Sequence, residues 1–289
     1  MTNLPDTLSR GEVADIRERY FTISQDSRYG HFVRIPQRIC RCLDYFHVAS
    51  SRVAVTQRLH SYYLFIGVVD DLIDSSRLEA GTEILGQLDN RIPCFDRETM
   101  QSQASLAAEV LKCHIDGQTY STALAQLKQL YRAVVRERNS RTIRAYIEER
   151  KVVGRLTAKL SYLLIRPLFE ADREDLCRFL EDVGEVGCLI DSVIDLRADD
   201  RLGLLSFSPS LKDHLKIATI TLRQGIRVTL KHPRLFGLFL EAVGDNVLDR
   251  LRSISSARKR PGVVPILETH SDTSRATAEG LASVAWTEP

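Results

Sequence analysis

Residues 62–74 read YYLFIGVVDDLID, an apolar run that ends in three aspartates. The part 62–69 is apolar on every side, which is typical of a helix buried in a protein core. Asp70 and Asp74 are four residues apart, so they project from the same face of such a helix, about 5–6 Å apart at Cβ. The stretch therefore predicts a buried helix that carries carboxylates at its end.

The carboxylates of Asp70, Asp71 and Asp74 would crowd the end of this helix and repel one another. A divalent cation would relieve the repulsion. Mg²⁺ suits the position because it binds one or two carboxylates, keeps several waters and takes up phosphate oxygens of a substrate. For one such cluster on its own, the alternative is an acidic helix end in contact with solvent. A second cluster elsewhere in the chain would favour the metal site.

A second acidic cluster follows another apolar stretch, residues 186–190. Asp191, Asp195 and Asp199 recur every four residues and therefore lie along one stripe of a helix. Gly184 precedes them, and because a glycine inside a helix costs about 1 kcal/mol, it indicates a close neighbour or a ligand. The alternative is that nearby arginines neutralise these acids in ordinary i,i+4 pairs. We expect the two acidic helices to face each other and to hold several metal ions against a diphosphate.

The rest of the chain shows the apolar spacing of helices, with no convincing strand and no internal repeat. Only 15 glycines and 9 prolines occur, which disfavours a sandwich or barrel with many tight turns. We predict one all-α domain over 10–257, between an N-terminal segment 1–9 and a mobile C-terminal tail 258–289. The predicted helices cover residues 11–22, 33–48, 51–76, 79–89, 99–114, 119–137, 140–166, 172–198, 210–231 and 234–256.

Composition excludes several classes of function. The 40 basic and 38 acidic residues nearly cancel, so no basic excess is present to release counterions, and we expect no nucleic-acid partner. The six cysteines form no CxxC pairs, which disfavours structural zinc. The polar N-terminus lacks the apolar core of a signal peptide, and no run reaches the roughly 18 apolar residues of a membrane span. We therefore expect a cytoplasmic protein with reduced thiols.

Both acidic motifs resemble those of the class I isoprenoid synthase superfamily, which includes trans-prenyltransferases, squalene and phytoene synthases and class I terpene cyclases. VVDDLID at 68–74 is similar to its first motif, DDxxD, and GCLIDSVIDLRAD at 187–199 to its second metal motif. The resemblance covers roughly residues 20–230. It implies a helical bundle around a deep apolar cavity, with three Mg²⁺ ions at the mouth. The metal ligands that it implies are Asp70, Asp71, Asp74, Asp191, Asp195 and Asp199.

Residues 150–157, RKVVGRLT, are a third feature. In terpene cyclases a comparable helix break follows an arginine that senses the diphosphate, and squalene and phytoene synthases carry a V-A-G-type sequence similar to 152–154. By this resemblance Arg150 is the diphosphate sensor and Gly154 the break. The alternative is an interior glycine that helix packing requires. Further candidates for binding the diphosphate are Lys151, Arg155 and Arg201.

The departures from the superfamily's patterns bear on the reaction. Chain-elongating prenyltransferases have an intact second DDxxD, whereas residues 191–195 carry Ser192 in the second place. Their upstream glycine-lysine-arginine motif is not legible; the nearest stretch is residues 29–34, YGHFVR. Elongation needs two diphosphates held at once, so these differences disfavour it. The spacing of the second cluster is closer to squalene and phytoene synthases and to cyclases.

The resemblance implies that magnesium and basic residues neutralise the diphosphate as it leaves, with Asp70, Asp74 and Arg150 as catalytic residues. The allylic cation would then rearrange in a cavity that excludes water, where aromatic faces stabilise positive charge. The candidates for lining this cavity are Tyr62, Tyr63, Phe65, Gly154 and Tyr162.

We therefore expect a terpene synthase that cyclises one linear prenyl diphosphate, farnesyl or geranylgeranyl diphosphate. One alternative is a prenyltransferase, either a head-to-head condensing enzyme of the squalene and phytoene kind or a chain elongator. A second alternative, from a different class, is an inactive helical partner subunit, although both acidic clusters are filled. The sequence leaves open whether the protein forms a homodimer. Chain length of the substrate depends on which side chains close the cavity floor, and that is a property of the tertiary structure.

Overall fold

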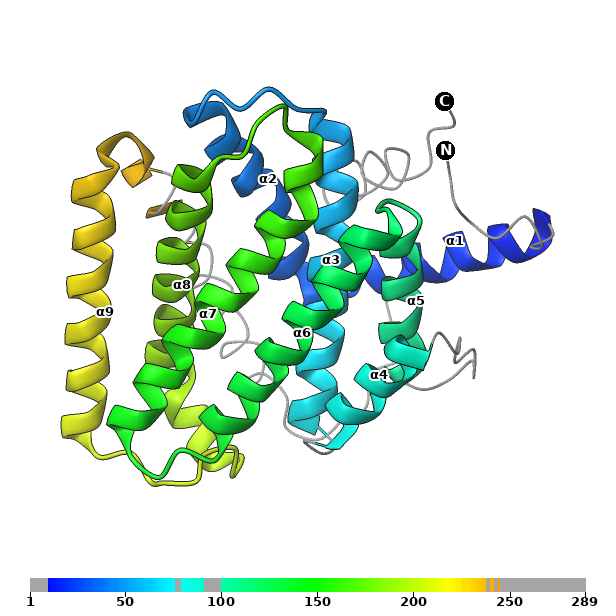
Figure 1. Ribbon diagram of the computed structural model, residues 1–289. Helices are drawn as coiled ribbons and strands as arrows, with labels where there is room; N and C mark the ends of the chain where they lie inside the picture. Colours follow the sequence, from blue (N-terminus) through cyan, green and yellow to red (C-terminus); the bar gives the residue numbers. More distant parts are fainter. Residues whose placement is uncertain (1–9, 76–78, 91–99, 238–239, 242–243, 245–289) are drawn as a thin grey trace.

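The computed structural model describes residues 10–75, 79–90, 100–237, 240–241 and 244 (Figure 1). These residues form nine α-helices and three short 3₁₀ turns and contain no strand, which confirms the all-α prediction. The α-helices are α1 Arg10–Ser24, α2 Gly30–Tyr45, α3 Arg52–Ser75, α4 Glu79–Asn90, α5 Met100–Lys112, α6 Gly117–Arg138, α7 Ile143–Ile165, α8 Glu174–Arg201 and α9 Leu211–Lys231. The turns are η1 Ser27–Tyr29, η2 Arg166–Leu168 and η3 Pro233–Leu235.

The observed helices follow the predicted ones closely, with ends that differ by a few residues. The helix predicted over 172–198 extends to Arg201 as α8. The helix predicted over 234–256 begins in the turn η3 and lies largely outside the described residues. The predicted segment 1–9 and the predicted tail 258–289 lie outside them as well.

Helix α3 lies between the two main parts of the core (Figure 1). Tyr62 and Tyr63 belong to the part shared with α2, α7 and α8. Leu64, Phe65 and Val68 belong to the other part, shared with α1, α4 and α5. Successive residues of a helix point about 100° apart, so a helix that is apolar on every side can serve two cores at once. This confirms the prediction of a buried helix, and its acidic end carries Asp70 and Asp74 to positions exposed to solvent.

Helices α7 and α8 pack backbone against backbone at two glycines. A Cβ atom built on Gly154 would lie 2.2 Å from the carbonyl oxygen of Gly184, and one on Gly184 would lie 2.4 Å from the carbonyl oxygen of Gly154. Helix α7 continues without interruption through Gly154. The predicted helix break is therefore wrong, and the alternative, a glycine that helix packing requires, is confirmed. Close approach of the two backbones leaves no room for a side chain, and this is the physical reason.

Gly154→Ala is expected to lower the free energy of unfolding by about 1–3 kcal/mol, because the new methyl group forces the two backbones apart. Gly187→Ala on α8 is the matched control, since a Cβ there meets nothing within 4 Å. In the control, alanine is expected to be neutral or to stabilise by up to about 1 kcal/mol through its helix propensity. Urea unfolding of both variants measures the difference. Equal effects of the two substitutions would contradict the close packing.

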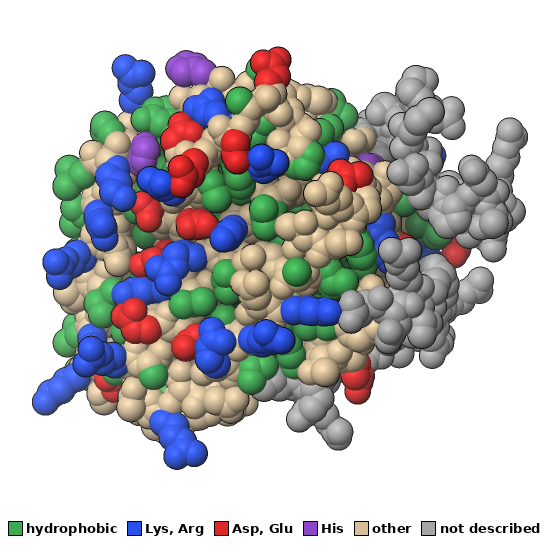
Figure 2. Space-filling view, viewed as in Figure 1, with side chains coloured by type: hydrophobic (Ala, Val, Ile, Leu, Met, Phe, Trp, Pro, Cys, Tyr) green, Lys and Arg blue, Asp and Glu red, His purple; other side chains and the backbone are tan. Residues whose placement is uncertain are grey.

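Charge on the visible face of the molecule follows the balanced composition: Figure 2 shows acidic and basic side chains interspersed over most of it. Helix α9 forms one edge of the bundle (Figure 1) and packs mainly against α8. Its inner side buries Ile217, Thr221, Gly225 and Val228. Ser210 and Asp213 form a capping box at its first turn, which satisfies backbone donors there and starts the helix.

Candidate functional site

The end of α3 and the second half of α8 bring the two acidic clusters into one region, which we call the carboxylate region and define as Asp70, Asp74, Asp191, Asp195 and Asp199. Burial raises the pKa of Asp199 to about 6, and the charges of Asp195 and of Asp74 add to the rise. The carboxylate of Asp74 therefore lies within electrostatic reach of Asp199, although Asp74 belongs to α3 and Asp199 to α8. Residues more than a hundred positions apart in the sequence therefore share one site.

Cys188 on α8 connects the deeper parts of the two clusters. Burial raises the pKa of its thiol to about 12, and the neighbouring carboxylates of Asp191 and Asp70 contribute to that rise. A single side chain thus lies within electrostatic reach of an aspartate from each acidic helix. No sequence motif singled out Cys188, because a cysteine on an apolar helix face carries no distinctive pattern.

Asp70 has an unusual environment for a carboxylate. Its side chain is exposed to solvent, yet loss of bulk hydration is the largest cause that raises its pKa to about 7, followed by the charge of Asp74. Arg150 and Arg138 counteract part of the rise. Since the like charges of Asp74 and Glu137 disfavour the ionised form of Asp70, a bound cation would stabilise that form.

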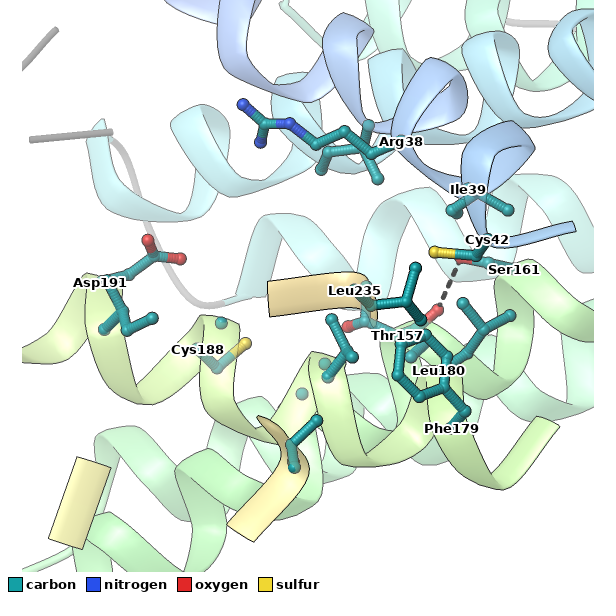
Figure 3. A pocket seen from close by; sticks show the side chains of 18 of the residues that line it. Arg38, Ile39, Cys42, Thr157, Ser161, Phe179, Leu180, Cys188, Asp191 and Leu235 are labelled. Atoms are coloured by element: carbon teal, nitrogen blue, oxygen red, sulfur yellow. Dashed lines mark hydrogen bonds between the residues drawn. The ribbon is translucent and has the colours of Figure 1, made fainter. Parts of the chain in front are cut away.

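Asp191 stands at the boundary between the carboxylate region and an apolar pocket. Burial raises its pKa to about 6, with the charge of Asp195 adding to the rise and Arg150 opposing it. The pocket has a volume of about 260 Å³ and lies among α2, α3, α7, α8 and the end of α9. Figure 3 shows Asp191 and Cys188 at one end of it and Cys42, Phe179 and Leu180 toward the other.

The pocket is lined mainly by apolar side chains, and its hydroxyl groups are those of Tyr63, Ser161, Thr157 and Thr229. The hydroxyls of Tyr63 and Ser161 are hydrogen-bonded to each other at 2.8 Å (Figure 3). Since each hydroxyl already has a partner, neither demands a polar ligand. Arg38 of α2 also lines the pocket, and in the view of Figure 3 its guanidinium extends toward the end where Asp191 lies. The pocket is therefore apolar along its length and charged at one end.

Arg150, the predicted diphosphate sensor, lies beside the carboxylate region and links three helices. Its Nε donates to the backbone carbonyl of Cys188 at 3.2 Å, and its Nη1 donates to Glu137 of α6 at 3.2 Å. Burial alone would lower the pKa of Arg150, but Glu137 and other anionic neighbours raise it well above the ordinary value. The guanidinium is therefore a permanent charge next to the aspartates.

Arg138 is a second basic residue of the site that the sequence motifs did not indicate. It stands in the last turn of α6 and forms an ion pair with Asp74. Its charge lowers the pKa of both Asp70 and Asp199 against the larger raising causes. The sequence feature that could have indicated Arg138 is the basic last turn of α6, RER at 136–138. Basic residues are common at helix C-termini, where they interact favourably with the helix dipole. Such a turn does not reveal which carboxylate it meets.

The other predicted diphosphate ligands pair elsewhere. Lys151 donates to Glu148 at 3.0 Å, and Arg155 donates to Glu185 at 3.2 Å. Arg201 is exposed at the end of α8. Arg150 lowers the pKa values of Asp70, Asp191 and Asp199, and Arg138 lowers those of Asp70 and Asp199. Neighbouring positions on a helix point about 100° apart, so Lys151 points away from the direction of Arg150 and pairs with Glu148 of its own helix.

The predicted cavity residues divide into two groups. Tyr63 and Gly154 line the pocket, whereas Tyr62, Phe65 and Tyr162 do not.

Each of the three has a structural role that explains its place. Tyr62 is buried and donates to the backbone carbonyl of Thr157 at 3.1 Å. Phe65 points to the opposite side of α3 and packs in the other part of the core. Tyr162, near the end of α7, donates to Asp172 and accepts from the backbone N–H of Arg173 at 2.9 Å.

Asp71, the middle aspartate of the first motif, is engaged outside the carboxylate region. Arg28 donates to it from Nη1 at 2.7 Å, and the hydroxyl of Tyr29 donates at 3.2 Å. It is adjacent to Asp70 in sequence but points about 100° away on the helix. The structure therefore ties Asp71 to the turn η1 rather than to its two neighbouring aspartates.

Within the described residues, no group of three or more histidines, cysteines, aspartates and glutamates converges closely enough to hold a metal ion by itself. The oxygen donors of the carboxylate region nevertheless fit Mg²⁺ in kind. This ion is held by one or two carboxylates, and waters and substrate phosphates complete its octahedron. The crowding that raises the pKa values of Asp70 and Asp199 also favours a cation there. The donor set fits a hydrated ion, not a cage made of protein alone.

Comparison with protein-family models, with curated proteins and with solved structures finds no match to this chain. Among the helices of the described residues, none combines the length and the apolarity that crossing a membrane requires. The cysteines at the described positions 40, 42, 113, 177 and 188 are free thiols.

The raised pKa of Asp191 predicts how stability changes with pH. Folding raises this pKa from 3.8 to about 6, so the folded state binds the proton more tightly than the unfolded chain does. The contribution of Asp191 to stability therefore falls as pH rises from about 4 to 6. Without metal, Asp191→Asn is expected to raise the free energy of unfolding at pH 7.5 by on the order of 1 kcal/mol. The gain should be smaller at pH 4.5.

Asp175→Asn, in the first turn of the same helix, is the control for this experiment. A hydrogen bond from Arg173 lowers the pKa of Asp175, so this substitution should give no gain at pH 7.5. Urea unfolding at both pH values measures the two variants. A gain for Asp191→Asn that is equal at pH 4.5 and 7.5 would contradict the environment described for Asp191.

Proposed function

We propose that this protein is a class I terpene synthase that ionises and cyclises a single linear prenyl diphosphate in a magnesium-dependent reaction. The observation that carries the proposal is the apolar pocket of about 260 Å³ that ends at Asp191, where carboxylates from α3 and α8 share one region. An apolar chain with a diphosphate at one end has the matching distribution of polarity. We include in this proposal that the helices form a bundle of the isoprenoid-synthase type around a deep apolar cavity.

The carboxylates have a division of roles in the proposed reaction. Asp70 and Asp74 would hold Mg²⁺ from the α3 side, and Asp191, Asp195 and Asp199 from the α8 side, with three ions implied by the resemblance. Bound Mg²⁺ supplies charge neutralisation for the leaving diphosphate. Side chains that are already held in place reorganise little when that charge develops. Such electrostatic preorganisation is the largest contribution to the rate enhancement of many enzymes.

Arg150 and Arg138 supply the permanent positive charge beside these aspartates. Arg150 is anchored by Glu137 and by the carbonyl of Cys188, so the guanidinium keeps its position while the diphosphate binds. The apolar side chains of the pocket exclude water from the allylic cation, which would otherwise be captured as an alcohol. Tyr63 lines the pocket and would offer an aromatic ring to stabilise positive charge there.

The size of the pocket favours one chain over two. Sites for a single small molecule measure about 300–1,000 Å³, and the pocket is slightly smaller than that range. This supports a cyclase over a head-to-head condensing enzyme or an elongator, which must hold two substrates. The free thiols of the described residues suit a reducing compartment, so a cytoplasmic location stays our prediction, as does the alternative of an inactive partner subunit.

Product analysis tests the proposal. Purified protein is incubated with Mg²⁺ and either farnesyl or geranylgeranyl diphosphate, and hydrocarbons are identified by gas chromatography and mass spectrometry. A cyclase yields a product from one substrate alone. A doubled chain would identify a condensing enzyme, and a product that requires added isopentenyl diphosphate an elongator. No product, with both substrates and with Mg²⁺ present, would favour the inactive subunit and overturn the proposal.

Magnesium and inorganic diphosphate together are expected to raise the melting temperature more than the sum of their separate effects. A ligand at a hundredfold excess over its Kd stabilises the folded state by about 2.7 kcal/mol, which is several degrees for a domain of this size. Both Asp74→Asn and Asp195→Asn should reduce the joint effect, because each removes a carboxylate from one of the two helices. A joint effect that survives both substitutions, measured by differential scanning fluorimetry, would remove the facing clusters from the model of binding.

A further inference from the structure

Helix α9 exposes a stripe of large apolar side chains along its outer side, with a gap between Leu215 and Leu222. Five large apolar side chains, each at least half exposed to solvent, lie on one face at helical spacing. The stripe consists of Leu211, Leu215, Leu222, Ile226 and Leu230, with exposed fractions of 77%, 62%, 65%, 50% and 76%. The inner side of the helix is already buried on the bundle. A long apolar stripe on the outer side therefore has no function in the core.

A basic stripe runs beside the apolar one. Each of the five apolar residues is followed by a lysine or arginine, and all five basic residues are exposed. They are Lys212, Lys216, Arg223, Arg227 and Lys231. Lys231 pairs with Asp182 of α8 at 2.8 Å, whereas the other four form no ion pair within the described residues. Asp213, the acidic residue of this helix, serves its capping box. The outer face of α9 is thus apolar along one side and positive along the next.

We propose that α9 docks this protein onto an anionic lipid surface. A helix with Leu on one side and Lys or Arg beside it lies in the plane of the interface, with its apolar side chains at the boundary of headgroups and acyl chains. The basic side chains then reach the phosphates of anionic lipids, which attract each Lys or Arg near the surface. One lipid surface supplies both partners: acyl chains for the apolar stripe, and anionic headgroups for the basic stripe beside it.

Charge argues against a second copy of this chain as the occupant. Two α9 helices facing each other would bring ten basic side chains together, five from each copy, with Asp213 as the acid that each helix contributes. Like charges across an interface are unfavourable, and lysine is depleted at protein interfaces. An anionic surface, in contrast, attracts all five basic side chains. Along this helix, Figure 2 shows Lys, Arg and hydrophobic side chains at the edge where Figure 1 places α9.

The docking face also leads to the pocket. The stripe ends at Leu230, and the next residues of the chain, His232, Leu235 and Phe236, line the pocket. Phe236 is 44% exposed, so this end of the pocket carries an exposed apolar side chain six residues beyond the end of the stripe. Docked α9 would place that end of the pocket beside the lipid. The docking itself does not depend on the proposed function, because neither the stripe nor its charges belong to the carboxylate region.

Vesicle flotation tests the inference with the full chain. The protein is mixed with vesicles of phosphatidylcholine alone, or with about one third phosphatidylserine, and the fraction that floats is measured at low and high salt. We expect binding to the anionic vesicles, weak binding to the neutral ones, and a decrease with salt. Leu222→Glu with Ile226→Glu should lower the partition coefficient at least about tenfold, since it removes apolar burial and adds negative charge. Arg223→Gln with Arg227→Gln should weaken binding to anionic vesicles alone.

Val53→Glu is the matched control, because Val53 is an exposed apolar residue, 46% exposed, on α3 rather than on α9. It should leave the partition coefficient unchanged, and circular dichroism should show intact helices in every variant. Equal binding to neutral and anionic vesicles, or binding that survives both α9 double variants, would overturn the inference. So would absence of vesicle binding together with a concentration-dependent dimer that Leu222→Glu dissociates, which would assign the stripe to a second copy.

Discussion

Replacing Asp70 by asparagine is expected to lower the turnover of a prenyl diphosphate by at least about a hundredfold. Loss of one preorganised electrostatic group in an active site costs about 10²–10³ in kcat. The surrounding protein and the charge of Asp74 raise the pKa of Asp70 to about 7. Its ionised form therefore gains most from a bound cation. Asparagine keeps the shape and removes the charge that would hold Mg²⁺.

Asp71→Asn is the matched control, one residue further along the same helix. Its carboxylate is engaged by Arg28 and Tyr29, so the substitution should change turnover by a few-fold at most. The concentration of Mg²⁺ that gives half-maximal rate adds a readout that a merely structural defect would not move: it should rise for Asp70→Asn and stay unchanged for Asp71→Asn. Comparable losses in the two variants would assign the first motif a structural role.

Replacing Arg150 by methionine is expected to lower the free energy of unfolding by about 3–5 kcal/mol, which is the usual cost of removing one partner of a buried ion pair. The side chain of Glu137 is only 7% exposed, and Arg150 is its partner at 3.2 Å. Without the guanidinium, a carboxylate stays buried with no cation at that distance. The backbone carbonyl of Cys188 also loses its donor. Urea unfolding gives the magnitude.

Two further variants separate this explanation from a general effect of mutating the α6–α7 contact. Arg136→Met breaks another ion pair between the same helices, with Glu149 at 2.9 Å. Arg136 is 53% exposed, so that substitution should cost no more than about 1 kcal/mol. Combining Arg150→Met with Glu137→Met should recover most of the lost stability, since an apolar pair of similar volume replaces the ion pair. A double variant as unstable as the single one would show that the buried charge is not the cause.

The features that follow from local pattern were predicted well from the sequence. Helix α3 has an apolar run on every side and three aspartates at its end, and it is buried where that pattern predicts it. The periodic stripe of α8 likewise places Asp191, Asp195 and Asp199 on one face. Helical periodicity depends on neighbours along the chain, so a single sequence contains it.

Pairings between helices could not be read from the sequence. Arg138 and Glu137 meet Asp74 and Arg150 because α6 lies beside the ends of α3 and α7, and a basic last turn does not indicate its partner. The same limit applies to the aromatic residues: Tyr62, Tyr63 and Phe65 are near neighbours in one run, yet Tyr63 alone of these three lines the pocket. A turn of 100° per residue separates them, and which direction faces the pocket is set by the packing of the other helices.

By itself, the sequence determined the all-α class, the positions of the helices and the two acidic clusters, because periodicity, capping and composition are local. The tertiary structure alone decided that α7 continues through Gly154, since its contact with Gly184 lies on another helix. It also decided that Asp71 turns to Arg28, and that the apolar residues of α9 remain on the surface. In each case, the deciding contact joins residues far apart in the chain, and only the packing of helices creates it.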